Sequence, residues 1–266
     1  MIPPDNPGRL ARAVVYEAAD LVTGRRGITR RINDEAIRFP PRWARYFPVD
    51  YQQATHRFLA SNCRRGTVAV DVGAHLGIFA VVMARRVGPG GRVLAFEPAP
   101  DTRRALLDIV SRNGVKGMVE IRPEAVSARS GLAQLHTTGA PAGVTNTLVP
   151  DPAATHRLSV RTVTIDGALN GHEAVSCMKV DAEGAEVEVL IGAGRTIAKW
   201  RPAIALDAHP DGLEKNDRDL SELWDQIKEW GYEVYGVHGE MDRAAFLEAT
   251  GPFEAHLLPK PSSTRV

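Results

Sequence analysis

The sequence lacks the features that define several large classes of protein. Two cysteines among 266 residues, Cys63 and Cys177, are too few for a disulfide framework or a cysteine metal site, so we expect a reducing, cytoplasmic location. No stretch approaches the roughly 18 apolar residues that a membrane span needs, and residues 1–10 contain no apolar run typical of a signal peptide. The formal net charge of +1 favours neither nucleic acid nor a membrane surface as a partner.

What the sequence does contain is a regular alternation of strand and helix patterns from residue 67 onward. The predicted strands of the main sheet are 67–73, 91–98, 118–127, 175–184, 201–209, 232–239 and 253–259. The predicted helices between them are 77–88, 101–114, 185–200 and 217–231, and 131–138 and 158–165 alternate as a hairpin does. This order predicts an α/β fold, with a mostly parallel seven-stranded sheet and helices on both of its faces.

The first 49 residues do not follow this alternation. Apolar residues at 10, 14, 15, 18, 21 and 22 predict an amphipathic helix over 9–25. We therefore expect an N-terminal helical extension over 1–49 and a main domain over 50–266. The helix would pack on that domain or on a second copy of the chain, so a homodimer is possible.

The first predicted parallel strand ends in a glycine turn, and ligands of such sheets bind at this edge. Gly73 and Gly77 give a G-x-x-x-G spacing, whereas a dinucleotide-binding turn has G-x-G-x-x-G. His75 stands at the middle position, where its side chain would crowd a pyrophosphate, and Asp71 would repel one. The turn therefore favours S-adenosylmethionine, which carries an ammonium and a sulfonium, over NAD. Glu97 ends the next strand, where a carboxylate can accept both hydroxyls of a ribose.

Several motifs together resemble one family. The segments VDVGAHLG, VLAFEPAPD, EAVS, TVTIDGAL, MKVDAEGAEVEVLIGA and RPAIALDAH stand in the order found in the FkbM family. Its members are class I S-adenosylmethionine-dependent methyltransferases, mostly O-methyltransferases of natural-product and sugar pathways. The resemblance covers about residues 50–240, and its most specific element is K-x-D-x-E-G-x-E over 179–186. His75 departs from the Asn that many members carry.

The resemblance implies a set of cofactor-binding residues. Those at the methionine end would be Asp71, Gly73 and Ala74, with Gly77 letting the next helix pack closely. Glu97 would hold the ribose, and Ala125 and Val126 would form the apolar edge that receives the adenine.

The acceptor side is predicted from the next two strand ends. Methyl transfer to a hydroxyl requires a group that takes its proton, and Lys179, Asp181 and His209 are the candidate catalytic residues, with His209 or Asp181 as the base. Three carboxylates, Asp181, Glu183 and Asp207, could instead bind a divalent metal such as Mg²⁺. Simpler readings stay open: Lys179 could merely pair with an acidic neighbour, and Glu183 and Glu186 could face a helix N-terminus.

The expected function is therefore methyl transfer from S-adenosylmethionine to a hydroxyl of a sugar, a glycosylated metabolite or a polyketide-type metabolite, as in secondary metabolism. The partner would be this small-molecule or glycan acceptor, enclosed by the 138–153 loop, the N-terminal segment and the 210–216 loop. Two alternatives are an NAD-dependent oxidoreductase and a non-catalytic partner subunit that binds S-adenosylmethionine. The sequence does not name the acceptor.

Overall fold

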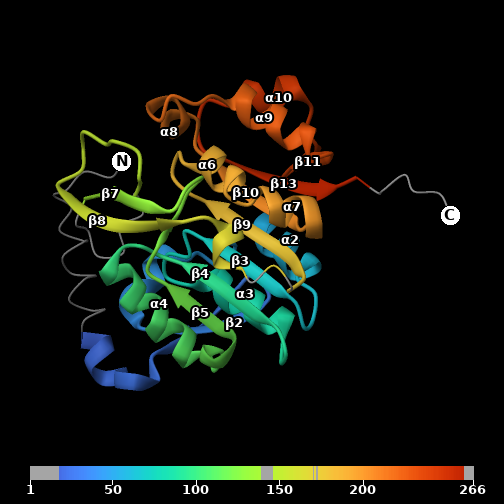
Figure 1. Cartoon of the computed structure of the whole chain (residues 1–266). Coiled ribbons are helices and arrows are strands. Elements are labelled where there is room, and N and C mark those ends of the chain that lie inside the picture. Colours follow the sequence, from blue (N-terminus) through green and yellow to red (C-terminus); the bar gives the residue numbers. More distant parts are fainter. Residues whose placement is uncertain (1–17, 139–145, 170, 172, 261–266) are drawn as a thin grey trace.

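The computed structural model describes residues 18–138, 146–169, 171 and 173–260, and its centre is an eight-stranded sheet (Figure 1). The strands lie in the order β12 (Gly239–Glu240), β11 (Tyr232–Gly236), β13 (Phe253–Pro259), β10 (Ala203–Ala208), β9 (Val175–Asp181), β3 (Val68–Val72), β4 (Arg92–Phe96) and β5 (Val119–Arg122). Neighbouring strands from β10 to β5 are parallel, whereas β13 is antiparallel to both β10 and β11. The predicted α/β fold is confirmed. The sheet has one strand more than expected, because the chain turns back after Gly236 and β12 pairs with the end of β11.

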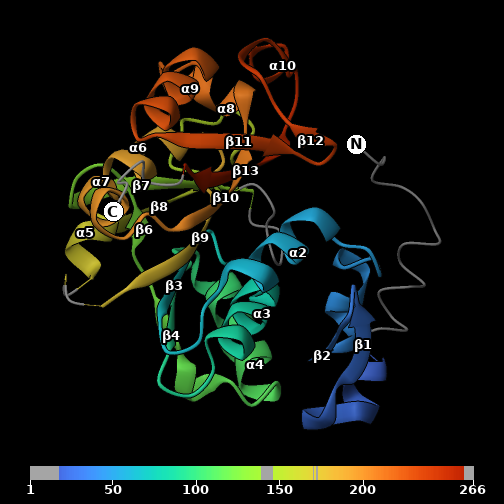
Figure 2. The ribbon, with the colours of Figure 1, turned by 90° about the vertical axis from the view of Figure 1, so that its right-hand side faces the viewer.

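Helices cover both faces of this sheet, as predicted (Figures 1 and 2). On one face lie α2 (Gln53–Asn62), α3 (Ile78–Val87) and α4 (Pro100–Arg112), and on the other α6 (Glu186–Ile191), α7 (Gly194–Trp200) and α9 (Leu220–Glu229). Successive strand residues point to opposite faces. In β3, Ala69 therefore packs with α2 and α3, whereas Val70 and Val72 pack with α6 and α9.

A smaller three-stranded sheet lies beside the large one. Its order is β6 (Ala125–Val126), β8 (His156–Val163) and β7 (Gly131–Thr137), and the predicted β7–β8 hairpin is confirmed. The single strand predicted over 118–127 is wrong, because the chain leaves the large sheet after β5 and joins the small one at β6. Pro123 stands between them and has no N–H to donate to a strand ladder.

The N-terminal extension is not purely helical. Residues 18–23 are helical, and the earlier part of the helix predicted over 9–25 lies outside the described residues. Two strands that the sequence reading missed follow, β1 (Ile28–Ile32) and β2 (Glu35–Phe39), which pair as a hairpin. Ile37 and Phe39 are fully buried in the same core as α2 to α4. The extension therefore shares the core of the main domain.

Short helices complete the chain: η1 (Gly24–Arg26), η2 (Pro41–Tyr46), η3 (Lys116–Met118), α5 (Ile165–Ala168), α8 (Pro210–Lys215) and α10 (Arg243–Leu247). Helix α8 replaces most of the loop expected over 210–216. The one helix predicted over 185–200 is two, α6 and α7, which separate at Gly192. A Cβ at Gly192 would lie 2.3 Å from the carbonyl oxygen of Ser127, so the chain passes the small sheet too closely for a side chain there.

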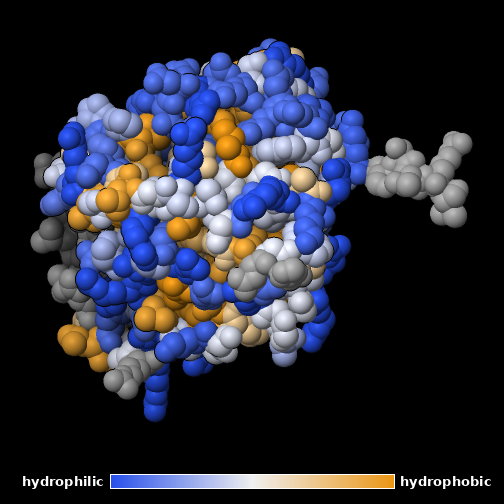
Figure 3. All heavy atoms as spheres, in the orientation of Figure 1, coloured by the Kyte–Doolittle hydropathy of each residue, from blue (hydrophilic) through white to orange (hydrophobic). Residues whose placement is uncertain are grey.

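The exposed hydrophobic side chains of the described residues are scattered. They are Leu21, Val22, Val49, Leu107, Leu132, Leu158, Ile191 and Val237. On the face in Figure 3, hydrophobic residues form small patches separated by hydrophilic ones. None of the helices in the described ranges has the length and apolar content that crossing a membrane requires.

The close approach at Gly192 predicts an unfolding experiment. Gly192→Ala should lower the free energy of unfolding by about 1–3 kcal/mol, because the added methyl group would meet the Ser127 carbonyl. Gly194 is the matched control, since a Cβ there meets nothing within 4 Å and alanine favours a helix. Gly194→Ala should leave the protein as stable or more stable in urea. Equal losses for the two variants would contradict the assigned contact.

Candidate active site

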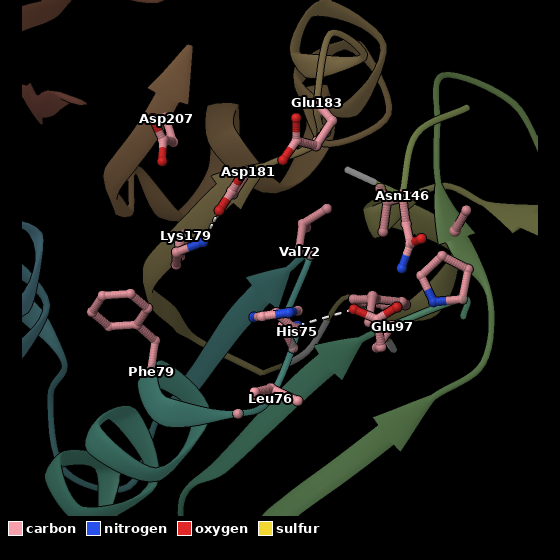
Figure 4. A pocket seen from close by; sticks show the side chains of 18 of the residues that line it. Val72, His75, Leu76, Phe79, Glu97, Asn146, Lys179, Asp181, Glu183 and Asp207 are labelled. Carbon is pink, nitrogen blue, oxygen red and sulfur yellow. Dashed lines mark hydrogen bonds and ion pairs between the residues drawn. The ribbon is translucent and has the colours of Figure 1, made fainter. Parts of the chain in front are cut away.

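A cavity of about 250 Å³, here called the reaction cavity, opens at the carboxyl ends of the parallel strands. The turn after β3, the end of β4 and the ends of β9 and β10 all contribute to its wall, as Figure 4 shows. These strand ends meet because neighbouring parallel strands finish at the same edge of a sheet. The location of the site at this edge is therefore as the sequence predicted.

The glycine turn brings the backbone close to its neighbours at two points. Gly73 has a φ of 70°, and a Cβ there would lie 2.0 Å from the carbonyl oxygen of Asp181. Gly77 has a φ of 86°, and a Cβ there would lie 2.2 Å from Leu106 of α4. Both positions therefore require glycine, for backbone conformation and for space. Gly73, Ala74 and Gly77 all line the reaction cavity.

Glu97 faces the cavity from the end of β4, where Figure 4 places it beside His75. Its two carboxylate oxygens accept hydrogen bonds from the backbone N–H groups of His75 (3.0 Å) and Ala99 (2.9 Å). Burial raises the pKa of Glu97 to about 7, although these two N–H groups act in the opposite direction. Each oxygen keeps a lone pair, so the carboxylate can still accept hydroxyl groups. The His75 N–H, by contrast, is already engaged and cannot also serve a pyrophosphate.

Asp71 differs from its predicted place. Its side chain is completely buried and is not among the described residues that line the cavity. Because strand side chains alternate, Asp71 points toward the α2 and α3 face, beside Lys179 of β9, to which it is paired in register. Neither carboxylate oxygen has a hydrogen-bond partner among the described groups. Asp71 therefore lies beneath the turn and acts on the cavity through charge.

The end of the cavity near Glu97, away from His209, is apolar. Ala125 and Val126 of β6, the predicted adenine edge, line it together with Phe96 and Leu135. Asn146 also lines this end, and Figure 4 shows it near Glu97. The 138–153 loop, one of the segments expected to enclose the acceptor, lies partly outside the described residues, since 139–145 are not described. Within its described part, the Thr147 hydroxyl donates to the Glu183 carbonyl (2.7 Å) and has a structural role.

Lys179 is the buried cation of the reacting end. Its ammonium donates to Asp181 at 2.8 Å and lies 5.4 Å from the ring centre of Phe79 (Figure 4). Burial alone would lower the pKa of Lys179, but Asp181 and Asp71 outweigh it and raise the pKa above its ordinary value. Lys179 is therefore charged and cannot accept a proton. The simpler reading, that it pairs with an acidic neighbour, fits this contact.

His209 meets a carboxylate that the sequence reading treated as a helix-terminus residue. Nδ1 of His209 lies 2.9 Å from Oε1 of Glu186, which is completely buried and also accepts the Gly184 N–H. Nε2 faces the cavity carboxylates, 3.6 Å from Glu183 and 3.9 Å from Asp181. Burial lowers the pKa of His209, yet these carboxylates, Glu186 first, raise it to about 9. The spacing of Glu186 within 179–186 was the available signal, but only the fold brings it to His209.

The fold brings together two of the three predicted metal ligands, Asp181 and Asp207. One ligand atom each of Asp181, Asp207 and His209 lies within 4.8 Å of the others, so among the described residues His209 takes the place expected of Glu183. These oxygens and the imidazole suit a divalent cation in type. However, Lys179 already donates to Asp181, and the Gln52 amide donates to Asp207 at 2.9 Å. Each contact uses one oxygen of its carboxylate, so a cation at the other oxygens would add its charge beside the Lys179 ammonium.

Two functional candidates come from the segment before α2, which sequence reasoning passed over. Tyr51 and Gln52 line the reaction cavity, and burial raises the pKa of Tyr51 to about 12. Gln52 adopts a left-handed backbone with a φ of 38°. Neither residue belongs to a strand end, so the rule that selected the other candidates could not find them.

Together, the strand order, the glycine turn and the acidic strand ends define the fold of class I S-adenosylmethionine-dependent methyltransferases. The model of the methyltransferase FkbM domain matches residues 71–234. The chain belongs to this family.

Two curated relatives are similar over much of their length. The 31-O-demethyl-FK506 methyltransferase FkbM of Streptomyces tacrolimicus is 28% identical over 190 residues, which cover 69% of this chain and 71% of the relative. Methyltransferase sdnD of Sordaria araneosa is 28% identical over 173 residues, which cover 52% of this chain and 64% of the relative.

Among solved structures, a methyltransferase FkbM from Methylobacillus flagellatus KT aligns with a TM-score of 0.49 and 18% identity. The alignment covers 76% of this chain and 50% of that one, so this chain spans about half of its length.

The buried position of Asp71 predicts a pH-dependent effect on stability. Burial raises its pKa to about 7, above the roughly 3.9 of an unfolded aspartate, so the folded chain binds this proton more tightly. The resulting stability is present at low pH and is lost as the pH rises through about 7. Asp71→Asn should therefore stabilise the protein by roughly 1–3 kcal/mol more at pH 8 than at pH 5, measured by urea unfolding.

Asp101→Asn is the control for this measurement, because Asp101 is an exposed carboxylate in the first turn of α4. Its effect on unfolding should be the same at both pH values. If Asp71→Asn behaves like this control, the Asp71 carboxyl is not buried without hydrogen-bond partners as described above.

Proposed function

We propose that the protein transfers a methyl group from S-adenosylmethionine to a hydroxyl of a sugar, a glycosylated metabolite or a polyketide-type metabolite. The observation that carries the proposal is one cavity with two chemically different ends. Glu97 and an apolar edge lie at one end, and His209 with its carboxylates lies at the other. The name of the Streptomyces relative, which specifies 31-O-demethyl-FK506 as the acceptor, supports oxygen as the methylated atom.

The residues at the first end fit the methyl donor. Gly73 and Gly77 have no side chain and Ala74 has only a methyl group, so the backbone of this turn is accessible at the cavity wall. Glu97 keeps lone pairs that can accept hydrogen bonds from ribose hydroxyls. Ala125 and Val126 supply the flat apolar edge that an adenine ring needs. When bound, S-adenosylmethionine supplies an electrophilic methyl group on a sulfonium, so the protein has to orient the hydroxyl and take its proton.

His209 is the proposed base, and Glu186 is the group that orients it. Because the Glu186 carboxylate accepts the Nδ1–H, the neutral imidazole keeps its lone pair on Nε2, on the side of the cavity. Nε2 then takes the hydroxyl proton, and Asp181 and Glu183 stabilise the resulting imidazolium. Asp181 is the weaker candidate for the base, because Lys179 already holds one of its oxygens.

The cofactor half of the proposal is tested by calorimetry with S-adenosylhomocysteine at pH 8. The wild-type protein should bind it, and Glu97→Ala should weaken binding about 10- to 100-fold, since a hydrogen bond to a charged group contributes roughly 1.5–3 kcal/mol. Glu120→Ala is the control, because Glu120 is an exposed carboxylate of the adjacent strand β5 outside the cavity. Absence of binding to the wild-type protein would overturn the proposal.

The base is tested by the pH dependence of methyl transfer, using 31-O-demethyl-FK506 and a panel of hydroxylated glycosides as acceptors. His209→Ala should reduce the rate about 10²- to 10⁴-fold while S-adenosylhomocysteine still binds. In the wild-type enzyme the rate should rise with pH toward the His209 pKa of about 9. Glu186→Gln keeps an acceptor for Nδ1–H but removes the charge, so this rise should move roughly one to three units lower.

Two outcomes would contradict this assignment. One is an unchanged pH profile in Glu186→Gln together with full activity in His209→Ala. The other is loss of activity in EDTA that Mg²⁺ restores, which would assign Asp181, Asp207 and His209 as metal ligands. We expect activity to survive EDTA, because the Lys179 ammonium already neutralises Asp181.

A further inference from the structure

A second and larger cavity adjoins the reaction cavity. This outer cavity has a volume of about 650 Å³, and its wall comes from the turn at 236–241, from Ala245 of α10 and from residues 252–254. Figure 2 shows these elements, β11, β12 and α10, at the end of the large sheet. The two cavities share Gln52 and Asp207, which therefore form the boundary between them.

The side chain at this boundary has an unused hydrogen-bonding atom. The Gln52 amide nitrogen donates to Asp207, but its oxygen is buried and has no partner within the described part of the chain. A buried acceptor without a partner costs about 1–3 kcal/mol. The left-handed backbone of Gln52 adds strain, which concentrates at ligand-binding sites. Both costs are consistent with a residue selected for contact with a ligand.

The wall of the outer cavity is held in a fixed position relative to Gln52. Three residues further along, the Thr55 hydroxyl and N–H both donate to Glu254, at 2.8 and 3.2 Å. Glu254 belongs to β13 and lines the outer cavity. These bonds join the start of α2 to β13 next to Asp207, to which Glu254 is paired in register, and so fix Gln52 at the boundary of the two cavities.

The lining residues define the chemistry of the occupant. Val237, Met241 and Phe253 supply apolar surface, whereas Asp207, Glu240 and Glu254 supply three carboxylates. No Lys or Arg occurs among the described residues that line the cavity. An anion would meet three carboxylates, and His238 is the one titratable cation among the described lining residues, so the wall fits a neutral or cationic body with substantial apolar surface.

A third hollow also adjoins the reaction cavity and is the competing location. Its volume is about 200 Å³, and it lies beyond Glu183 and His209, between α8 and residues 147–151. The outer cavity, at about 650 Å³, offers more room for the non-reacting body of an acceptor than this hollow does.

We propose that the outer cavity binds the non-reacting body of the acceptor, and that this body is uncharged or cationic and largely apolar. Gln52 would contact the acceptor at the boundary, while its reactive hydroxyl enters the reaction cavity. This assignment rests on the proposed methyl transfer and adds to it the place and the chemical class of the acceptor.

The test uses fluorophores attached in the two competing locations. Ala245→Cys places a thiol in the outer cavity, and Lys215→Cys places one in the third hollow, both at exposed helix positions. Cys63 and Cys177 are buried, so a neutral, polarity-sensitive maleimide will label the introduced thiol. The probe is octyl glucoside below its micelle concentration, with S-adenosylhomocysteine present. The Ala245→Cys conjugate should respond saturably, at concentrations at least about tenfold lower than the Lys215→Cys conjugate.

Reversing the charge of Glu240 tests whether the outer cavity disfavours an anionic ligand. Octyl sulfate should bind the Ala245→Cys conjugate at least about tenfold more weakly than octyl glucoside, and Glu240→Lys should remove this difference. Glu229→Lys makes the same change of net charge at an exposed residue that does not line the cavity, and should leave the difference intact. Equal binding of the two probes by the unmodified wall would overturn the assigned class.

The assignment of the acceptor body to the outer cavity is overturned if the Ala245→Cys conjugate gives no saturable response. It is also overturned if the Lys215→Cys conjugate responds at equal or lower concentrations. Calorimetry with S-adenosylhomocysteine, on the same conjugates and on the wild-type protein, separates this failure from a failure of the proposed function. Loss of S-adenosylhomocysteine binding in the wild-type protein would overturn the methyltransferase proposal. Intact binding without a glucoside response would overturn only the acceptor site.

Discussion

The ion pair between Lys179 and Asp181 is the contact on which the rest of the site depends. Asp71, Asp181 and Asp207 stand on three adjacent strands at one edge of the sheet, and Lys179 is the buried cation among them. Lys179 reaches Asp181 from two positions earlier in β9, and Asp71 is its register partner in β3. With this charge in place, the carboxylates can be held close together and the His209 imidazole can be placed beside them.

The most local features were those that the sequence predicted best. The strands and the glycine turn carry their signals within a few residues. Most parallel strands therefore lie near their predicted positions along the chain, with Gly73 and Gly77 in a turn and Glu97 at a strand end. Contacts between segments distant in the sequence were not predicted. The Glu186–His209 pair joins residues 23 positions apart. The face to which Asp71 points depends on strand alternation, which a reading of strand ends alone ignores. The β1–β2 hairpin and Gln52 precede the regular alternation and gave no strand-end signal.

The donor-binding part of the site lies inside the region that matches the family, whereas most of the proposed acceptor site lies outside it. The region that matches the FkbM domain is 71–234, and it contains the glycine turn, Glu97 and the K-x-D-x-E-G-x-E stretch. Gln52 and most of the outer cavity wall, at 236–254, lie outside it. Family membership therefore supports S-adenosylmethionine as the methyl donor. The proposed acceptor site is built from segments that flank the matched region, which explains why the sequence indicated the donor and not the acceptor.

The central claim is that one cavity holds the methyl donor between Glu97 and the His209 side. A crystal structure with S-adenosylhomocysteine tests it most directly. We expect the ligand in the reaction cavity, with its ribose hydroxyls on Glu97, its adenine against Ala125 and Val126, and Lys179 still bonded to Asp181. A ligand bound in the outer cavity, or one that makes no contact with Glu97, would contradict it.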